Sequence, residues 1–384
     1  MRNFKLIIWI VILIVSLIYM PVWAEENEEE IMEEEIIVTS TRAKEMESAS
    51  PGMTQTISED QIEQTGGRDI SRVLTENGVT VSTYGGEFSV STLSLDGSTS
   101  EQTMVMVNGI PVTAGHNGNI DLTLFPVEGV ERIEITHGPL SSLYGANALG
   151  GVMNIITGLT GEVKNKLKVG TGSYGSHIAS LTIKRKKWGL ALGGSHTDGY
   201  RLHSQSNRKF ISGQLDLISQ NEDYLKMNLL YTVKNAEVPG SLDFPVAGAQ
   251  SDSLISLDLS GKKNFLHGEW EYKLFNQVLK NSYTDTYTDD RHRAVYYGID
   301  FAAFYNIPGH KILGGSVIRR DLFESTVTGE NSHGTGGIFI QDNWFITRSI
   351  NLVSGLRCDM HSVYGFSFSP RINFIKRFTD GFTA

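Results

Sequence analysis

The sequence predicts an α+β domain followed by an antiparallel β-barrel that crosses a membrane. Three observations lead to this prediction. Residues 1–24 have the features of an export signal. Residues 50–157 mix helical and strand patterns. Residues 158–384 form a series of segments in which apolar and polar side chains alternate, which is the pattern of a strand with one apolar face.

The first 24 residues have the three parts of a signal peptide. Arg2 and Lys5 form a basic start, Leu6–Met20 is an apolar core, and Ala24 provides a small residue at the cleavage point. An uncleaved membrane anchor is the alternative, because this segment falls barely short of the roughly 20 residues that span a bilayer. The proline just before the cleavage point favours the signal peptide, since proline breaks a helix. We expect the mature chain to leave the cytoplasm.

Residues 25–49 predict a disordered acidic leader with one short strand-forming segment. Eight glutamates lie between Glu25 and Glu35, and charges this dense repel one another and bury nothing. They supply most of the formal net charge of −10, and no large basic field remains to attract nucleic acid. The hexamer Ile36–Thr41 is apolar and β-branched. It can pair with its own domain or add a strand to a partner's sheet.

The mixed segment begins with two short helices. Ser58 and Gln61 have the spacing of a capping box, in which each side chain satisfies the free N–H of the other residue. Residues 70–74 place apolar side chains on one face of a second helix, which is expected to end near Asn77.

Later in the same segment the pattern changes to strands and close packing. Asn108-Gly109 lies between two apolar runs, which is a strong hairpin signal. Residues 130–135 alternate as a strand that places Arg132 and Glu134 on one side. The uncharged, glycine-rich stretch Gly138–Thr157 indicates confined surroundings, because glycine permits a close approach between backbones.

Twelve alternating segments predict the strands of the barrel. They are Lys164–Gly170, Ile178–Arg185, Trp188–Gly194, Phe210–Ile218, Tyr224–Val233, Leu254–Ser260, Glu269–Val278, Ala294–Tyr305, Lys311–Ile318, Gly337–Phe345, Ile350–Asp359 and Ser369–Phe378. Aromatic residues near their ends are candidates for interfacial girdles. These are Trp188, Trp270, Tyr296, Tyr297 and Trp344.

The joins between these segments are alternately short and long. The long, polar joins are predicted at Thr197–Lys209, Lys234–Ser253, Leu279–Arg293 and Arg319–Gly336. A transmembrane barrel has tight turns at its periplasmic end and long loops outside. A soluble β-sandwich is the alternative, and it predicts shorter strands with similar turns at both ends.

Several stretches follow one another in an order that is typical of one family. They are Glu35–Ser40, Val107–Gly109, Ile133–Pro139 and Tyr144–Ile156, with Gly337–Trp344, Gly355–Asp359 and Ser369–Arg371 further along. From about residue 35 to residue 384 the chain resembles the TonB-dependent outer-membrane receptors, and most of all their vitamin B12 and catecholate-siderophore branch. The resemblance implies an α+β plug domain (50–157) inside a transmembrane antiparallel β-barrel (158–384) in the bacterial outer membrane.

The resemblance also implies partners and sites. Residues Glu35, Ile36, Ile37, Val38, Thr39, Ser40 and Thr41 match the TonB box, which the TonB protein of the inner membrane captures and pulls. Family analogy places a large polar ligand (cobalamin, a siderophore or haem) on the plug apex. The candidate residues there are Tyr84, Gly85, Gly86, Glu87, Phe88, His116, Asn117 and Asn119. The implied function is energised uptake, and a passive pore or adhesin-like barrel without TonB coupling is the alternative.

The chain departs from the family pattern at three places. Asp96 stands where the family has arginine, and His137 also replaces an arginine, so the usual ion pairs between plug and wall are in doubt. The strands amount to about half of the 22 in the family's barrel. We therefore expect the chain to be a fragment, since an open barrel leaves unpaired backbone groups in lipid.

Other kinds of function lack the residue patterns that they require. The sequence has neither G-x-S-x-G nor H-E-x-x-H, so we expect no enzyme, no cofactor and no metal site. Asp285, Asp289 and Asp290 offer carboxylates to calcium, but a charged outer loop explains them more simply. His292 and His310 are too isolated to indicate haem. The single cysteine is expected to be a packed or lipid-facing residue.

Overall fold

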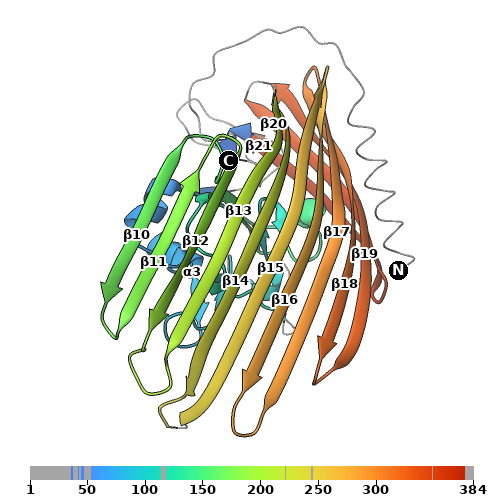
Figure 1. The fold of residues 1–384 in the computed structure, drawn as a ribbon. Coiled ribbons are helices and arrows are strands. Elements are labelled where there is room, and N and C mark those ends of the chain that lie inside the picture. Colours follow the sequence, from blue (N-terminus) through green and yellow to red (C-terminus); the bar gives the residue numbers. More distant parts are fainter. Residues whose placement is uncertain are drawn as a thin grey trace, which may run out of the picture.

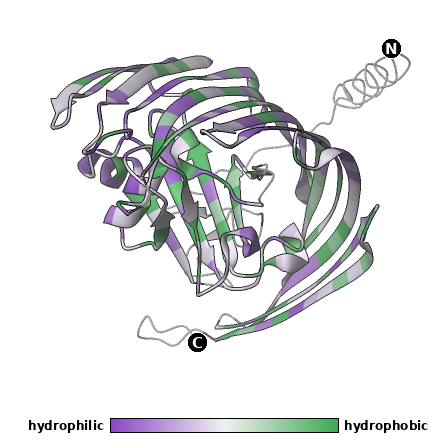
Figure 2. Ribbon diagram, turned by 90° about the horizontal axis from the view of Figure 1, so that it is seen from below, coloured by the Kyte–Doolittle hydropathy of each residue, from purple (hydrophilic) through white to green (hydrophobic). Residues whose placement is uncertain are grey.

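The computed structural model describes residues 36–37, 42, 45–46, 53–112, 114, 118–220, 222–243, 245–347 and 349–376. The predicted signal peptide and the glutamate-rich part of the leader lie outside these residues. The described residues form an N-terminal domain of mixed helices and strands, and a curved sheet, here called the wall, that bends around it (Figures 1 and 2). This arrangement confirms the predicted fold class.

A five-stranded sheet with the order β3-β8-β9-β6-β7 is the centre of the N-terminal domain. Its strands are β3 (Thr54–Ser58), β6 (Thr103–Val107), β7 (Ile110–Pro111), β8 (Val130–His137) and β9 (Gly151–Thr157). β6 and β9 are parallel, and the other pairs are antiparallel. Two small pairs lie apart from this sheet. They are β1 (Ile36–Ile37) with β2 (Glu45–Met46), and β4 (Val81–Thr83) with β5 (Ser91–Leu93).

Short helices join these strands, and the first two, α2 and α3, lie where the sequence predicts helices. They are α2 (Glu59–Gln64), α3 (Ile70–Glu76) and α4 (Ser141–Tyr144), with the 3₁₀ turns η2 (Ser100–Gln102) and η3 (Leu122–Leu124). Both hydrogen bonds of the predicted capping box are present, since Ser58 N–H donates to Gln61 Oε1 at 2.9 Å and Gln61 N–H donates to Ser58 Oγ at 3.4 Å. The buried face of α3 consists of Ile70, Val73 and Leu74.

Glycine permits close contacts in the stretch 138–157, but mostly within the N-terminal domain itself. A Cβ on Gly151 would lie 2.5 Å from the Thr136 carbonyl oxygen, and a Cβ on Gly150 would lie 2.1 Å from Ser98 Oγ. Only Gly145 approaches the wall, where its Cβ would lie 3.5 Å from Arg357 Nε. Close contacts are therefore present as expected, and at the two tightest positions the neighbouring atoms belong to the N-terminal domain itself rather than to the wall.

The wall is a 12-stranded antiparallel meander in sequence order, as the sequence predicts. Its strands are β10 (Lys164–Gly172), β11 (Ser176–Lys184), β12 (Trp188–Thr197), β13 (Ser206–Gln220), β14 (Asp223–Gly240), β15 (Pro245–Phe265), β16 (Gly268–Thr284), β17 (Asp289–Ile307), β18 (His310–Ser325), β19 (Gly329–Thr347), β20 (Ile350–His361) and β21 (Gly365–Lys376). β10 and β21 are the two edges of this sheet in the described part of the chain, so the wall is an open barrel (Figure 2).

The two faces of the wall differ in polarity. Outward positions carry exposed apolar residues, as a face in contact with lipid tails requires. Examples are Leu192, Ile211, Leu229, Ile255, Phe301, Ile340, Leu356 and Phe366. Inward positions carry mostly polar residues that the N-terminal domain covers. Examples are Arg208, Lys234, Asp252, Gln277, Asp300, Gln341 and Arg357. Cys358 shares the outward face of β20 with Leu356 and Met360, in agreement with the lipid-facing alternative.

Trp188, Trp270 and Trp344 are exposed on the outward face, close to the upper ends of their strands in Figure 1. This position fits an aromatic girdle at one membrane interface. Tyr297 is also exposed on the outward face. The same prediction is wrong for Tyr296, which is buried and whose hydroxyl donates to the Ala114 carbonyl of the N-terminal domain at 3.1 Å.

The predicted long loops are mostly strands. β14 continues to Gly240 and β15 begins at Pro245, and β16 to β19 extend in the same way into the joins 279–293 and 319–336. Only the join between Thr197 and Ser206 keeps a substantial loop. The prediction fails because strands that rise beyond a bilayer have water on their outer face, so the alternation on which it depends disappears while the backbone pairing continues.

The joins between the wall strands form two rims. The lower rim, at the bottom of Figure 1, consists of the joins after β10, β12, β14, β16, β18 and β20, and the upper rim consists of the joins after β11, β13, β15, β17 and β19.

Among the described residues, we find no helix whose length and hydropathy would let it cross a bilayer.

Candidate functional site: the interface between the N-terminal domain and the wall

One side of the N-terminal domain packs on the wall through apolar side chains. Met106, Leu143 and Val152 of the domain share a buried cluster with Phe304 and Phe339 of the wall. Such burial is non-directional, with about 25 cal/mol per Å² of apolar surface removed from water. The polar contacts around this cluster therefore determine how the domain is oriented in the wall.

Arg42 forms the first polar contact along the described chain. Its Nη1 lies 3.0 and 3.1 Å from the two carboxylate oxygens of Asp300 on β17. Its guanidinium carbon lies 4.6 Å from the ring centre of Tyr144 in α4 and 4.5 Å from that of Phe339 on β19. Burial raises the pKa of Tyr144, so the phenol stays neutral beside the cation. Arg42 is thus enclosed by one acid and two rings from both bodies.

A second buried contact lies toward the lower rim. Lys234 on β14 is fully buried and pairs with Asp121, which precedes η3, and with Asp252 on β15 at 3.2 Å. Its Nζ also donates to Thr123 Oγ1 at 3.1 Å. Asp121 in turn accepts N–H bonds from Ser91 and Thr123, so the same carboxylate orders the apex of the N-terminal domain. We call Lys234, Asp121 and Asp252 the lysine triad.

Arg208 on β13 attaches the neighbouring loop to the wall. Its Nη1 donates to the Thr123 carbonyl at 2.9 Å, and its Nη2 donates to the Arg68 carbonyl. Its guanidinium carbon lies 4.9 Å from the ring centre of Phe88. Removing this side chain would therefore leave two buried carbonyls and one ring without their partner, and a buried polar group without a partner is costly.

Some of the predicted ligand residues are exposed, and others already contact neighbouring side chains. Tyr84 and Gly85 are exposed, and a Cβ on Gly86 would lie 3.4 Å from the Tyr200 ring of the join after β12. Glu87 pairs with Arg68 at 2.5 Å, and Phe88 is buried under Arg208. All five residues lie in one loop, and its contacts with the loop after β12 and with Ser206 place it toward the lower rim.

The other predicted ligand loop is described only in part. His116 and Asn117 lie outside the described residues. Asn119 is half-buried, and Ser100 Oγ donates to its Oδ1. The predicted TonB box is also described only at Ile36–Ile37, whose backbone pairs antiparallel with β2. Glu35 and residues 38–41 lie outside the described residues, so the role of this segment stays a prediction.

The two departures from the family pattern contact each other. His137 Nδ1 lies 2.8 Å from Asp96 Oδ1, and the Gly138 N–H donates to Asp96 Oδ2 at 3.2 Å. Asp96 adopts the left-handed backbone conformation that a tight turn requires, with φ of 51°. The pair ties the turn before η2 to the end of β8 within the N-terminal domain. The ion pairs between the domain and the wall are made elsewhere, with Arg42–Asp300 and Asp121–Lys234 as the most buried ones.

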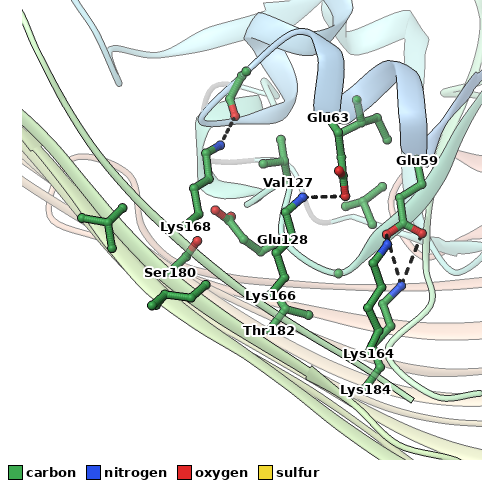
Figure 3. A pocket seen from close by; sticks show the side chains of 17 residues that line it. Glu59, Glu63, Val127, Glu128, Lys164, Lys166, Lys168, Ser180, Thr182 and Lys184 are labelled. Atoms are coloured by element: carbon green, nitrogen blue, oxygen red, sulfur yellow. Dashed lines mark hydrogen bonds and ion pairs between the residues drawn. The ribbon is translucent and has the colours of Figure 1, made fainter. Parts of the chain in front are cut away.

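A polar cavity of about 450 Å³ separates α2 from β10 and β11 (Figure 3). Four contacts cross it. Glu59 pairs with Lys164 and Lys184 at 3.4 Å each, and Glu63 pairs with Lys166 at 2.5 Å. Lys168 Nζ donates to the Gly67 carbonyl at 3.2 Å. Partly exposed pairs of this kind contribute at most about 1 kcal/mol each, so this side of the interface is the easier one to open.

The pair between Glu63 and Lys166 predicts a pH-dependent attachment of α2. The hydrogen bond from Lys166 lowers the pKa of Glu63. A carboxyl with a lowered folded-state pKa contributes stability above its ordinary pKa of about 4.3, and loses it as the pH falls through the folded value. We expect Glu63→Gln to lower the unfolding midpoint slightly at pH 7, by an amount that shrinks as the pH falls below about 4.3. Lys166→Gln should behave alike, and a difference that stays the same size as the pH falls would contradict the assignment.

Sequence reasoning missed Arg42, Lys234 and Arg208. A basic residue after a strand-forming segment, or within a predicted polar loop, is usually solvated. Lys234 and Arg208 differ from solvated residues in that they point inward from a wall strand, and Arg42 differs in that it contacts two such strands. These positions can be recognised only once the register of the wall strands is known. Within the described residues, no group of three or more His, Cys, Asp or Glu side chains is arranged to hold a metal ion.

Comparison with known proteins identifies both bodies. The family model described as the TonB-dependent Receptor Plug Domain matches residues 47–152. The described residues of this range form the N-terminal domain. This part of the chain belongs to the plug-domain family of TonB-dependent receptors. The N-terminal domain is therefore the plug, and the wall matches the barrels of such receptors in fold.

Curated relatives place the chain near the vitamin B12 transporters. It is 29% identical over 177 residues to the vitamin B12 transporter BtuB of Vibrio cholerae serotype O1, covering 44% of this chain and 29% of the relative. It is 26% identical over 275 residues to BtuB of Photobacterium profundum, covering 70% of this chain and 42% of the relative. The chain thus spans less than half the length of these relatives.

Solved structures support the fold. The pyoverdine outer membrane receptor FpvA from Pseudomonas aeruginosa PAO1, bound to pyoverdine, superposes with a TM-score of 0.73 at 15% identity. The match covers 90% of this chain and 63% of that receptor. At this identity the likeness shows a shared plug-and-barrel architecture.

Proposed function

We propose that this receptor serves the energised uptake of a large, scarce ligand across the bacterial outer membrane, with cobalamin or an iron–siderophore complex as the favoured cargo. The relatives named vitamin B12 transporters support cobalamin, and the architecture shared with a pyoverdine receptor supports a siderophore. In this proposal residues 1–24 are the signal peptide, 25–49 the leader with the TonB box, 50–157 the plug and 158–384 the barrel.

The position of Arg42 is the observation that supports this function most. Arg42 directly follows the proposed TonB box (35–41), and it is enclosed by Asp300, Tyr144 and Phe339. A pull on residues 35–41 therefore acts on the contacts of Arg42 before it acts on any plug contact further along the described chain. Because Tyr144 belongs to α4, loss of its contact with Arg42 also weakens the packing of the plug against the wall. A passive pore has no need for such a connection.

The two rims fit opposite sides of the membrane. The one substantial loop, between Thr197 and Ser206, and the strand extensions into the predicted long joins all lie at the lower rim, whereas the upper-rim joins have two or three residues. Such barrels have their shortest turns on the periplasmic side, so the upper rim faces the periplasm and the lower rim faces outside. Asp300 lies in the half of β17 nearer the upper rim, where TonB approaches. The exposed loop with Tyr84 lies toward the lower rim, where ligand arrives. The acidic leader keeps the box soluble within the periplasm.

Deletion of residues 36–41 tests the proposal. The deletion variant is expected to bind cobalamin or a ferric siderophore at the cell surface as the unaltered receptor does, and to lose uptake at least tenfold, because no strand remains for TonB to capture. Deletion of six leader residues, 26–31, is the matched control and should leave uptake unchanged. Uptake that continues without the box would favour the passive pore.

A further inference from the structure

The join after β11 is the most basic turn at the upper rim. It consists of Arg185, Lys186 and Lys187, whereas the other four upper-rim joins contain a single lysine or arginine between them, Arg348. The Asp216 N–H of β13 donates to the Lys187 carbonyl at 2.8 Å, which fixes the turn against a neighbouring strand. We call Arg185, Lys186 and Lys187 the basic turn.

The positive charges of the basic turn are not neutralised by the protein. Both of its lysines are exposed, and no carboxylate in the described part of the chain pairs with any of its three cations. Elsewhere at the same rim the basic groups have acidic partners, since Lys263 pairs with Asp223 at 2.5 Å and His310 lies 2.8 Å from Asp342. Three adjacent like charges repel one another, so an anion that binds from outside the chain stabilises the turn.

Arg185 is held in place by one nitrogen and one ring. Its Nη1 donates to Asn165 Oδ1 at 2.8 Å and to the Lys184 carbonyl at 2.7 Å. Its guanidinium carbon lies 5.8 Å from a ring centre of Trp188. The Nε and Nη2 atoms have no hydrogen-bond partner among the residues that the structure describes. These two nitrogens form the edge of a guanidinium that donates to two phosphate oxygens at once.

The basic turn lies where the apolar outer face of the wall ends. Side chains alternate along β11, and Lys184 points inward to the plug, so Arg185 faces outward. Trp188 is exposed on the same outward face, and the next outward pair toward the middle of the strands is Ile183 with Leu190. Basic and aromatic side chains at the end of an apolar belt lie at the height of lipid headgroups.

We propose that the basic turn binds the phosphate group of an anionic phospholipid in the membrane leaflet at the upper rim. Arg185 donates to two phosphate oxygens through its free edge, the two lysines add positive charge, and the acyl chains lie on the apolar face beside Trp188. A soluble acidic partner would meet the lysines, but it would not reach a guanidinium that lies against a lipid-facing ring. The inference goes beyond cargo uptake and depends on the proposed function only for the placement of the wall in a membrane.

Titration of the full chain in an uncharged detergent with phosphatidylglycerol, followed by native mass spectrometry, tests the site. The triple variant Arg185→Gln, Lys186→Gln, Lys187→Gln is expected to lose at least about tenfold in affinity, since each cation near a charged lipid contributes about fivefold. Arg185→Lys keeps the charge and should still lose about two- to fivefold, because lysine lacks the planar fork. Phosphatidylcholine, which carries no net charge, should bind the unaltered protein at least about tenfold more weakly than phosphatidylglycerol.

A matched control removes the same number of positive charges at the opposite rim. Arg291→Gln, Arg293→Gln, Arg320→Gln changes three exposed arginines near the lower rim and should bind phosphatidylglycerol like the unaltered protein. The unfolding midpoint gives a second readout, because a ligand that binds only the folded state raises it. Phosphatidylglycerol should raise the midpoint of the unaltered protein and of this control, but not that of the triple variant of the basic turn.

Four results would overturn the inference. They are unchanged affinity for phosphatidylglycerol in the triple variant, equal affinity of the unaltered protein for both lipids, displacement of the lipid by inorganic phosphate at constant ionic strength, and displacement by a peptide with the glutamate-rich sequence of residues 25–35. The third would show a site for free phosphate, and the fourth a site for an acidic protein segment. None of these measurements uses cargo or residues 36–41, so failure of the lipid site leaves the proposed uptake testable by the deletion described above.

Discussion

Replacing Lys234 by methionine is expected to destabilise the seated plug by about 3–5 kcal/mol, because it leaves two buried carboxylates without their cation. Asp121 and Asp252 both pair with Lys234, and Asp252 also accepts hydrogen bonds from Asn281 and Gln250, with no second cation paired to it among the described residues. Methionine keeps the volume of the site, so the loss reports charge rather than packing. The measurement is the unfolding midpoint, together with protease sensitivity of the loop that ends at Asp121.

Two further variants make this result specific to the lysine triad. The triple variant Lys234→Met, Asp121→Asn, Asp252→Asn removes all three charges and is expected to regain most of the lost stability, since replacing a whole buried ionic group is often neutral. Lys263→Met is the matched control, because Lys263 pairs with Asp223 at 2.5 Å at a partly exposed site within the wall. It should cost no more than about 1 kcal/mol. Stability of Lys234→Met equal to that of the unaltered protein would contradict the role of the triad.

Arg42→Ala is expected to reduce uptake at least tenfold while ligand binding at the outer surface persists. The substitution removes the contact through which we propose that the box acts on the plug, and it leaves Asp300 buried without its partner. The unpaired carboxylate is expected to cost about 3–5 kcal/mol, with a smaller loss from the contacts to the Tyr144 and Phe339 rings.

A second substitution separates coupling from stability. Asp300→Asn in the Arg42→Ala background removes the unpaired charge, so the unfolding midpoint should recover. Uptake should not recover, because the mechanical connection is still absent. Recovery of both properties would show that Arg42 only balances a charge, and uptake that is unchanged in Arg42→Ala alone would remove the proposed coupling route.

The sequence predicts local structure well where short-range chemistry determines it. The capping box at Ser58, the buried face of α3 and the left-handed pair Asn108-Gly109 all depend on neighbours within a few residues. The order and number of the wall strands also follow from alternation, because lipid on one side requires apolar residues there. Strand lengths do not follow, since β14 and β15 continue to Gly240 and from Pro245 where no lipid imposes a pattern.

The site is predicted less well, because its polar contacts join distant parts of the chain. Lys234 lies at the start of a predicted polar loop, whereas its partner Asp121 lies 113 residues earlier. Asp96 and His137 are recognised as departures one at a time, yet only the fold brings their side chains together. In the sequence, Tyr296 is one of several aromatic residues near predicted strand ends, and only the strand register shows that it faces inward.

The central claim is that ligand passes only when the plug moves relative to the wall. An engineered disulfide between the plug apex and the wall tests it most directly. A Cβ on Gly86 would lie 4.0 Å from Ser204 Cβ, which fits the distance that a disulfide spans. The pair Gly172 and Ser176 has a corresponding distance of 3.6 Å within the wall and provides the control. Cys358→Ser in both removes the natural thiol.

The measurement is ligand uptake by cells that carry the Gly86→Cys, Ser204→Cys receptor, before and after addition of reductant. We predict that uptake is lost while the disulfide is closed and returns when it is reduced, and that the Gly172→Cys, Ser176→Cys control takes up ligand in both states. Uptake at the normal rate with the plug fastened to the wall would contradict the account.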